Sequence, residues 1–145
     1  MRFRINTADV RVNAPVEYVG LTEDRAMETP KGWWSVGWYE LGPLPGQEGS
    51  AVLAGHLDSD TGKAVFWDLD KLRIGDEVSV IDRNGNTTRF RVRDKEVYYA
   101  DNAPIEKIFG GSGGSHLNLI TCDGVFDRQA GVYDRRLVVF TDRVD

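Results

Sequence analysis

Residues 78–92 read Val-Ser-Val-Ile-Asp-Arg-Asn-Gly-Asn-Thr-Thr-Arg-Phe-Arg-Val. The Asn84-Gly85 pair in the middle can adopt the positive φ angles that a tight hairpin turn needs. After the turn, Phe90 and Val92 alternate with arginines, as in a strand with one buried and one solvated face. The segment therefore predicts an antiparallel hairpin and favours a β-rich fold.

Short β-branched segments separated by turn residues continue this pattern along the chain. The chain contains 16 glycines, and it has no long run with helical periodicity. Strands are predicted at residues 11–18, 35–39, 50–55, 77–82, 87–98, 116–121 and 136–141. Short helical segments are predicted at residues 65–71 and 103–109, followed by a flexible connector over residues 110–114. The predicted fold class is all-β, or mainly β, with short connecting helices.

Length and composition limit the classes of protein that the chain can represent. At 145 residues it fits one domain spanning residues 1–145, which is large enough to bury a core without disulfides or metals. The net charge is −5 and the basic residues are scattered, which argues against nucleic acid as a partner. No run approaches the roughly 18 apolar residues of a membrane span, and residues 1–6 turn polar too early for a secretory signal. We therefore expect neither nucleic-acid binding nor a transmembrane segment within these residues.

Three residues with catalytic potential stand at the ends of apolar runs. Cys122, the only cysteine, follows the run 117–121, His56 follows the run 51–55, and Arg136 begins a third run. A single thiol cannot form an internal disulfide. Polar side chains at the ends of buried strands lie at an open edge, where a nucleophile, a proton carrier and a cation can act together. The pattern therefore predicts acyl-transfer chemistry.

The same residues lie in motifs that resemble those of the sortase family. Residues 119–122 (Leu-Ile-Thr-Cys) resemble the end of the sortase cysteine motif Thr-Leu-x-Thr-Cys, with Asn118 in place of the first threonine. Residues 54–56 (Ala-Gly-His) resemble the histidine motif, and residues 136–140 (Arg-Leu-Val-Val-Phe) resemble the arginine-bearing strand. The order His, Cys, Arg also agrees, and the resemblance extends from residue 12 to the last strand.

Within the family, three further segments indicate a class. Residues 56–59, 64–66 and 121–127 are most similar to the class F sortases of Gram-positive bacteria, and class E is next.

The resemblance implies a single closed sortase-type β-barrel with the active site of a cysteine transpeptidase. Cys122 would attack the threonine carbonyl of a Leu-Pro-x-Thr-Gly (LPXTG) sorting signal and form a thioester. His56 would act as general acid and then as general base, and Arg136 would stabilise the oxyanion or anchor substrate carbonyls. The implied partners are the sorting-signal peptides of surface proteins and an amine acceptor of a cell-wall precursor, so that surface proteins become anchored to the cell wall.

The resemblance also implies a location, whereas the expectation for cofactors and metals comes from the residues themselves. The family normally works at the extracellular face of the cell membrane, held by an N-terminal helix, and we expect this location with an anchor that these residues lack. We expect no cofactor and no metal. His56, Asp58 and Asp60 alternate in a polar loop, but no paired Cys or His spacing accompanies them. Calcium at the acidic loops stays open as an alternative, because Asp58, Asp60, Asp123 and Asp127 are oxygen donors, although no loop has the spacing of an EF-hand. His116 is expected to begin a strand.

Two neighbours of the proposed catalytic residues are candidates for substrate binding. Thr121 points to the opposite face of its strand from Cys122, yet its hydroxyl could help to hold the substrate or the oxyanion. Asn118 replaces a threonine of the motif but can still donate and accept hydrogen bonds. Arg135 is the alternative to Arg136, since adjacent strand residues face opposite ways and a shift of one residue in register would exchange them.

A groove for the Leu-Pro part of the signal needs an apolar lining. The candidates stand between the cysteine and the arginine, and they are Val125, Phe126, Val132 and Tyr133.

Two other functions stay open at the level of sequence. A hydrolytic cysteine peptidase would share the thioester and differ only in the molecule that resolves it. The papain-like order is excluded because its cysteine precedes its histidine. A non-catalytic β-barrel that binds peptides is the other alternative, and it rests on the four tryptophans, Trp33, Trp34, Trp38 and Trp67. Such a module has no need for His, Cys and Arg together at strand ends.

Overall fold

The computed structural model of the chain describes residues 1–111, 113–122, 125–127 and 132–144, with side chains up to residue 122 and from residue 135 onward. Its strands are β1 (Arg2–Asn6), β2 (Arg11–Val19), β3 (Val36–Tyr39), β4 (Gly49–Gly55), β5 (Asp58–Ser59), β6 (Gly62–Lys63), β7 (Glu77–Ile81), β8 (Thr87–Tyr99), β9 (Ser115–Thr121), β10 (Val125–Asp127) and β11 (Val132–Val144). Its helical segments are the 3-10 turns η1 (Leu69–Lys71) and η2 (Ala100–Asn102) and the short helix α1 (Ile105–Phe109).

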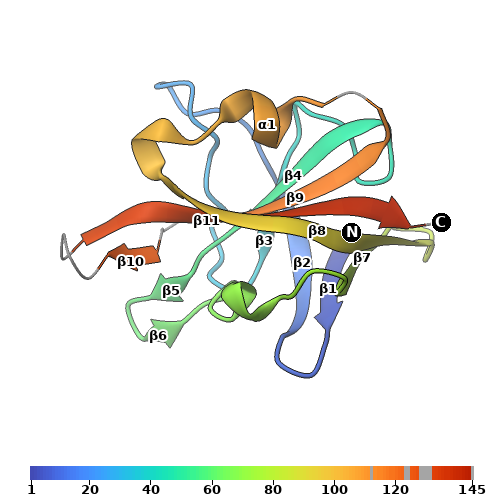
Figure 1. Ribbon diagram of the computed structural model, residues 1–145, viewed down its shortest axis with the longest axis horizontal. Coiled ribbons are helices and arrows are strands. Elements are labelled where there is room, and N and C mark those ends of the chain that lie inside the picture. Colours follow the sequence, from blue (N-terminus) through green and yellow to red (C-terminus); the bar gives the residue numbers. More distant parts are fainter. Residues whose placement is uncertain (112, 123–124, 128–131, 145) are drawn as a thin grey trace.

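The strands form a closed barrel in the order β11-β8-β7-β1-β2-β3-β4-β9, and pairing of β9 with β11 closes it. β10 pairs with the outer end of β11, and β5 and β6 form a separate small hairpin, as Figure 1 shows. Most neighbours are antiparallel, but β2–β3 and β4–β9 are parallel. The predicted closed, mainly β barrel is therefore confirmed.

Two apolar clusters lie on opposite faces of the strands β4, β9 and β11. One face of these strands points into the barrel and carries Leu53, Leu119 and Val139. The other face carries Val52 and Val138, which pack beneath α1. In Figure 1, α1 lies above β4 and β9. Burial on both faces explains why these strands are nearly continuous apolar runs, whereas the hairpin β7–β8 alternates.

The first strand was not predicted. In β1, Phe3 and Ile5 are buried and alternate with exposed residues. The alternation is the ordinary signature of a half-buried strand, but it extends over only five residues. The predicted strand at 136–141 is also longer, since β11 begins at Val132.

The helix predicted at residues 65–71 is wrong in its first half. Only η1 is helical, because the amides of Val65 and Phe66 donate to the carbonyls of Trp33 and His56 and not within a helix. The other predicted helix is confirmed as α1, which begins after Pro104. Among the described residues, no helix is long and apolar enough to cross a membrane.

Candidate active site

Cys122 and His56 follow the ends of two parallel neighbouring strands. The register of β4 and β9 sets Gly55 beside Thr121, so the next residue of each strand leaves the sheet at the same edge. The amide of Cys122 donates to the carbonyl of Gly55 at 2.9 Å, and Cys122 Sγ lies 3.2 Å from His56 Nδ1. A thiol and an imidazole at this distance can exchange a proton directly.

The second ring nitrogen of His56 fixes the tautomer of the imidazole. His56 is only 7% exposed, and its Nε2 lies 2.7 Å from the carbonyl oxygen of Pro30. Because a carbonyl can only accept, Nε2 is the protonated nitrogen. Nδ1 therefore accepts from the Cys122 thiol, or donates to the thiolate when the imidazole is protonated. The indole of Trp33 packs edge-on against the imidazole at a centroid distance of 4.5 Å.

Gly55, the residue before His56, packs closely against Phe66 and Val65. A Cβ built at this position would meet the Phe66 ring at 2.7 Å and Val65 Cγ1 at 2.8 Å. Contacts this short are essentially absent from real structures, so either these two side chains or the backbone at Gly55 would have to move. A shift of the backbone would also displace the carbonyl that accepts from the Cys122 amide.

Gly55→Ala is expected to destabilise the protein by about 1–3 kcal/mol through overpacking. Urea denaturation measures this loss. Gly42→Ala is the matched control, because a Cβ there meets nothing nearer than 3.4 Å. Equal stability of the two variants would contradict the packing argument.

Arg136 lies on the same face as Cys122, and Arg135 does not. Strands β9 and β11 pair antiparallel with Val138 opposite Ile120; two residues further along, this register brings Arg136 opposite Cys122. Both residues line one cavity. The guanidinium of Arg135 instead stacks on the ring of Tyr99, 5.2 Å from its centroid.

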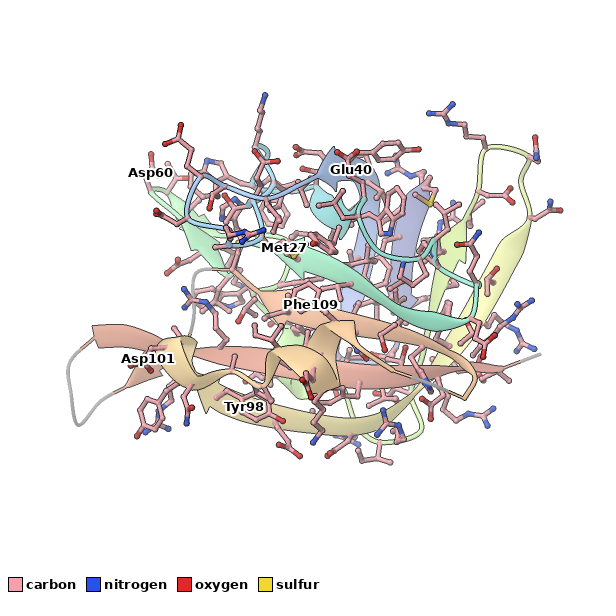
Figure 2. All side chains as sticks on the ribbon, turned by 90° about the horizontal axis from the view of Figure 1, so that it is seen from above. Met27, Glu40, Asp60, Tyr98, Asp101 and Phe109 are labelled. Atoms are coloured by element: carbon pink, nitrogen blue, oxygen red, sulfur yellow. The ribbon has the colours of Figure 1, made fainter. Side chains whose placement is uncertain are left out.

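The cavity beside Cys122 has a volume of about 530 Å³ and a largely apolar lining. One wall is the β2–β3 connection, with Leu21 and Met27, and the other is the α1 region, with Ile105 and Phe109. Figure 2 labels Met27 and Phe109, which come from these two walls. Residues of β4, β9 and β11, together with Cys122 after β9, form the floor; its members are Ala54, Ile120, Thr121, Cys122 and Arg136. A cavity of this size and character is typical of a site for a small apolar ligand or an apolar peptide segment.

The sequence did not indicate these cavity walls. Residues 21–29 and 100–109 lie outside the histidine, cysteine and arginine motifs, and neither segment contains a histidine or a cysteine. The predicted groove residues Val125, Phe126, Val132 and Tyr133 have side chains outside the described residues.

Asn118 and Thr121 are both buried in the structure. Thr121 is fully buried, and its hydroxyl accepts a hydrogen bond from the Leu137 amide at 3.1 Å. Asn118 lies beneath α1, where its side-chain amide donates to the Ile108 carbonyl at 2.7 Å. Asn118 is absent from the cavity lining, whereas Ile108 belongs to it. The asparagine in place of the motif threonine therefore ties the cavity wall to the barrel.

Asn118→Ala is expected to lower the free energy of unfolding by about 1–3 kcal/mol, because the Ile108 carbonyl loses its buried donor. Amide exchange in α1 should accelerate more than exchange in β7. A uniform acceleration across both elements would contradict a specific role of Asn118 in holding α1.

His116 is remote from Cys122, as expected for a residue at the start of a strand. It lies in β9 near Ser115, with its Nδ1 2.7 Å from Asp142. Among the described residues, no group of three or more His, Cys, Asp or Glu side chains is arranged to hold a metal ion.

Comparison with known families identifies the barrel. The family model described as the sortase domain matches residues 4–144. The chain belongs to the sortase family. Sortases are cysteine transpeptidases that act on sorting signals of surface proteins, and the expected family is thereby confirmed at this level.

Solved structures of sortases share the fold. Sortase C1 of Streptococcus agalactiae, in complex with MTSET, has a TM-score of 0.73 at 24% identity, over 99% of this chain and 66% of the other. Sortase C-1 of Actinomyces oris has a TM-score of 0.74 at 26% identity, over 99% and 73%. Sortase A of Corynebacterium diphtheriae has a TM-score of 0.74 at 20% identity, over 99% and 60%. This sortase thus spans just under two thirds of the length of the streptococcal protein. No curated protein matches the chain.

Proposed function

We propose that residues 1–145 form a sortase catalytic domain that cleaves an LPXTG-type sorting signal through a thioester and transfers the acyl group to an amine. The observation that carries the proposal is the 3.2 Å approach of Cys122 Sγ to His56 Nδ1, beside an apolar cavity that Arg136 also lines. A nucleophile, a proton carrier and a fixed cation at one cavity are what acyl transfer requires.

The first half of the reaction forms the thioester. The thiolate of Cys122 attacks the threonine carbonyl, and the C=O bond becomes a tetrahedral oxyanion. When this intermediate collapses, the C–N bond to the following residue breaks. His56 Nδ1 gives its proton to the departing amine, and the acyl group stays on Cys122.

The second half transfers the acyl group. An incoming amine gives its proton to His56 Nδ1 and attacks the thioester carbonyl. The C–S bond breaks, Cys122 leaves as the thiolate, and a new amide bond joins the two peptides. The Pro30 carbonyl accepts from Nε2 throughout, so the same nitrogen faces Cys122 in both halves.

Arg136 supplies positive charge without a proton. A guanidinium does not deprotonate at any relevant pH, so its role is to stabilise the oxyanion or to anchor substrate carbonyls. Its place in the cavity lining with Cys122 supports this role over one for Arg135.

The apolar cavity fits the leucine and proline of a sorting signal. Met27, Ile105 and Phe109 offer apolar surface from two walls, and such surface binds side chains without hydrogen-bonding capacity. The threonine carbonyl would then lie near Cys122, which lines the same cavity.

The finer assignments rest on the motifs. We propose class F, with class E next, from the similarity of residues 56–59, 64–66 and 121–127. The proposed location is the extracellular face of the cell membrane, because sortases are enzymes associated with the cell surface. The proposed partners are sorting-signal peptides and an amine acceptor of a cell-wall precursor.

Mass spectrometry of the products of this chain with a Leu-Pro-x-Thr-Gly peptide and oligoglycine tests the proposal. A joined peptide is the expected result. Hydrolysis that persists at saturating amine would indicate a cysteine peptidase. No conversion across a panel of sorting signals and amines would overturn the enzymatic proposal and favour a peptide-binding module.

A further inference from the structure

The connection between β2 and β3 both lines the cavity and contacts the imidazole of His56. Its first part, residues 21–29, forms one cavity wall. Its second part carries the Pro30 carbonyl that meets His56 Nε2 and the Trp33 ring that packs on the imidazole. The Val65 amide donates to the Trp33 carbonyl at 3.0 Å, so this part of the connection is tied to the segment that follows the β5–β6 hairpin.

A single carboxylate on β2 holds this second part in place. Glu17 Oε1 accepts from the Lys31 amide at 2.9 Å, and Oε2 accepts from the Gly32 amide at 2.9 Å. The hydroxyl of Ser35 also donates to Oε2. Two of these bonds hold the residues that directly follow Pro30, and the third holds Ser35 just before β3.

The Glu17 carboxylate and its three donors, from Lys31, Gly32 and Ser35, form a clamp. The absence of a side chain at Gly32 keeps this clamp compact. A Cβ on Gly32 would lie 2.7 Å from Ser35 Oγ and 3.4 Å from Glu17 Oε2. A side chain at position 32 would therefore displace the Ser35 hydroxyl from its place beside the carboxylate. The clamp is therefore specific in shape as well as in charge.

The charge state of Glu17 suits this role. Burial raises the pKa of its carboxyl, but the hydrogen bonds from Ser35, Gly32 and Lys31 lower it, and the charge of Lys31 adds to them. The net direction is a lowered pKa, so the carboxylate is ionised at neutral pH and able to accept all three bonds.

We propose that Glu17 is a positioning residue for the Cys122–His56 pair: its carboxylate fixes residues 30–35, so that the Pro30 carbonyl holds the Nε2–H tautomer of His56 and keeps Nδ1 directed at Cys122. The inference rests on the proposed function, since it assigns Glu17 to the machinery of that site. Glu17 touches neither reacting atom and acts through a backbone carbonyl that no side-chain substitution can remove.

The clamp also predicts a dependence of stability on pH. A carboxyl whose pKa is lower in the folded than in the unfolded state stabilises the fold above the unfolded pKa, and this stabilisation is lost as pH falls through the folded pKa. The melting temperature of the wild type should exceed that of Glu17→Gln at neutral pH, and the difference should shrink in acid. A difference that stays constant with pH would contradict the ionised clamp.

Nitrogen NMR of the imidazoles tests the positioning directly. The chain has two histidines, and His116, held by Asp142, is the internal reference. In the wild type, neutral His56 should be the Nε2–H tautomer; in Glu17→Gln it should become a mixture of both tautomers. Asp82→Asn is the matched control, because Asp82 likewise accepts two backbone amides in a turn but lies in the β7–β8 connection. Retention of the pure Nε2–H tautomer in Glu17→Gln would overturn the proposal.

Alkylation of the single cysteine by iodoacetamide gives a second readout that needs no sorting peptide. We expect Glu17→Gln to slow alkylation at neutral pH about tenfold, because proton transfer to a misplaced imidazole is less effective, while Asp82→Asn leaves the rate unchanged. Ser35→Ala removes one clamp bond only, and it should give a smaller effect in the same direction if Glu17→Gln does not fold. Equal rates in the wild type and in the clamp variant that folds would overturn the inference. A peptide assay that fails while both readouts change as expected would instead count against the proposed function.

Discussion

Cys122→Ala is expected to abolish both cleavage of the sorting signal and transfer to the amine, by at least about 10³-fold. The chain has no second thiol, so no other side chain can form the thioester. Chromatography of the peptide products measures the loss.

A control separates chemistry from folding in this variant. Cys122 is partly buried at the end of β9, and removal of one sulfur atom should leave the barrel intact. Circular dichroism and binding of the uncleaved peptide should therefore match the wild type. Turnover that persists in a folded Cys122→Ala protein would contradict nucleophilic catalysis by this residue.

Arg136→Ala is expected to lower kcat/KM about 10²–10³-fold, the usual cost of removing a group that stabilises an oxyanion. Steady-state kinetics with a fluorogenic sorting peptide measures it. A larger effect on kcat than on KM would indicate oxyanion stabilisation, and a larger effect on KM would indicate anchoring of the ground state.

Arg135→Ala is the matched control for this prediction. The two residues are adjacent and equally charged, but Arg135 stacks on Tyr99 while Arg136 lines the cavity with Cys122. We expect Arg135→Ala to change kcat/KM by only a few fold. A larger loss in Arg135→Ala than in Arg136→Ala would mean that the assignment of the two arginines is reversed.

Local patterns predicted most strands because their side chains alternate or form apolar runs. The hairpin β7–β8 follows directly from Asn84-Gly85 and from the alternation of Phe90 and Val92. The apolar run before Cys122 predicted β9 but not its two-sided burial, since α1 covers one face from a distant part of the chain. The ends of β4 and β9 carry the motif residues, so the approach of His56 to Cys122 depends on a parallel pairing that no local pattern specifies.

The surroundings of His56 could not be predicted from side-chain motifs. The group that fixes its tautomer is the carbonyl of Pro30, and every residue has a carbonyl. The carboxylate that holds this carbonyl in place belongs to Glu17 on β2, which has no position in the histidine motif. Likewise, the cavity walls come from two connections whose closeness depends on how the barrel closes.

Intact-protein mass spectrometry, after mixing with a sorting peptide in the absence of amine, tests the central claim most directly. The account predicts a mass increase equal to the acyl fragment ending in threonine, carried by the proteolytic fragment that contains Cys122. Addition of oligoglycine should remove this increase and release the joined peptide. An acyl group attached to another residue, or no acyl-protein with any sorting signal that is turned over, would contradict a thioester at Cys122.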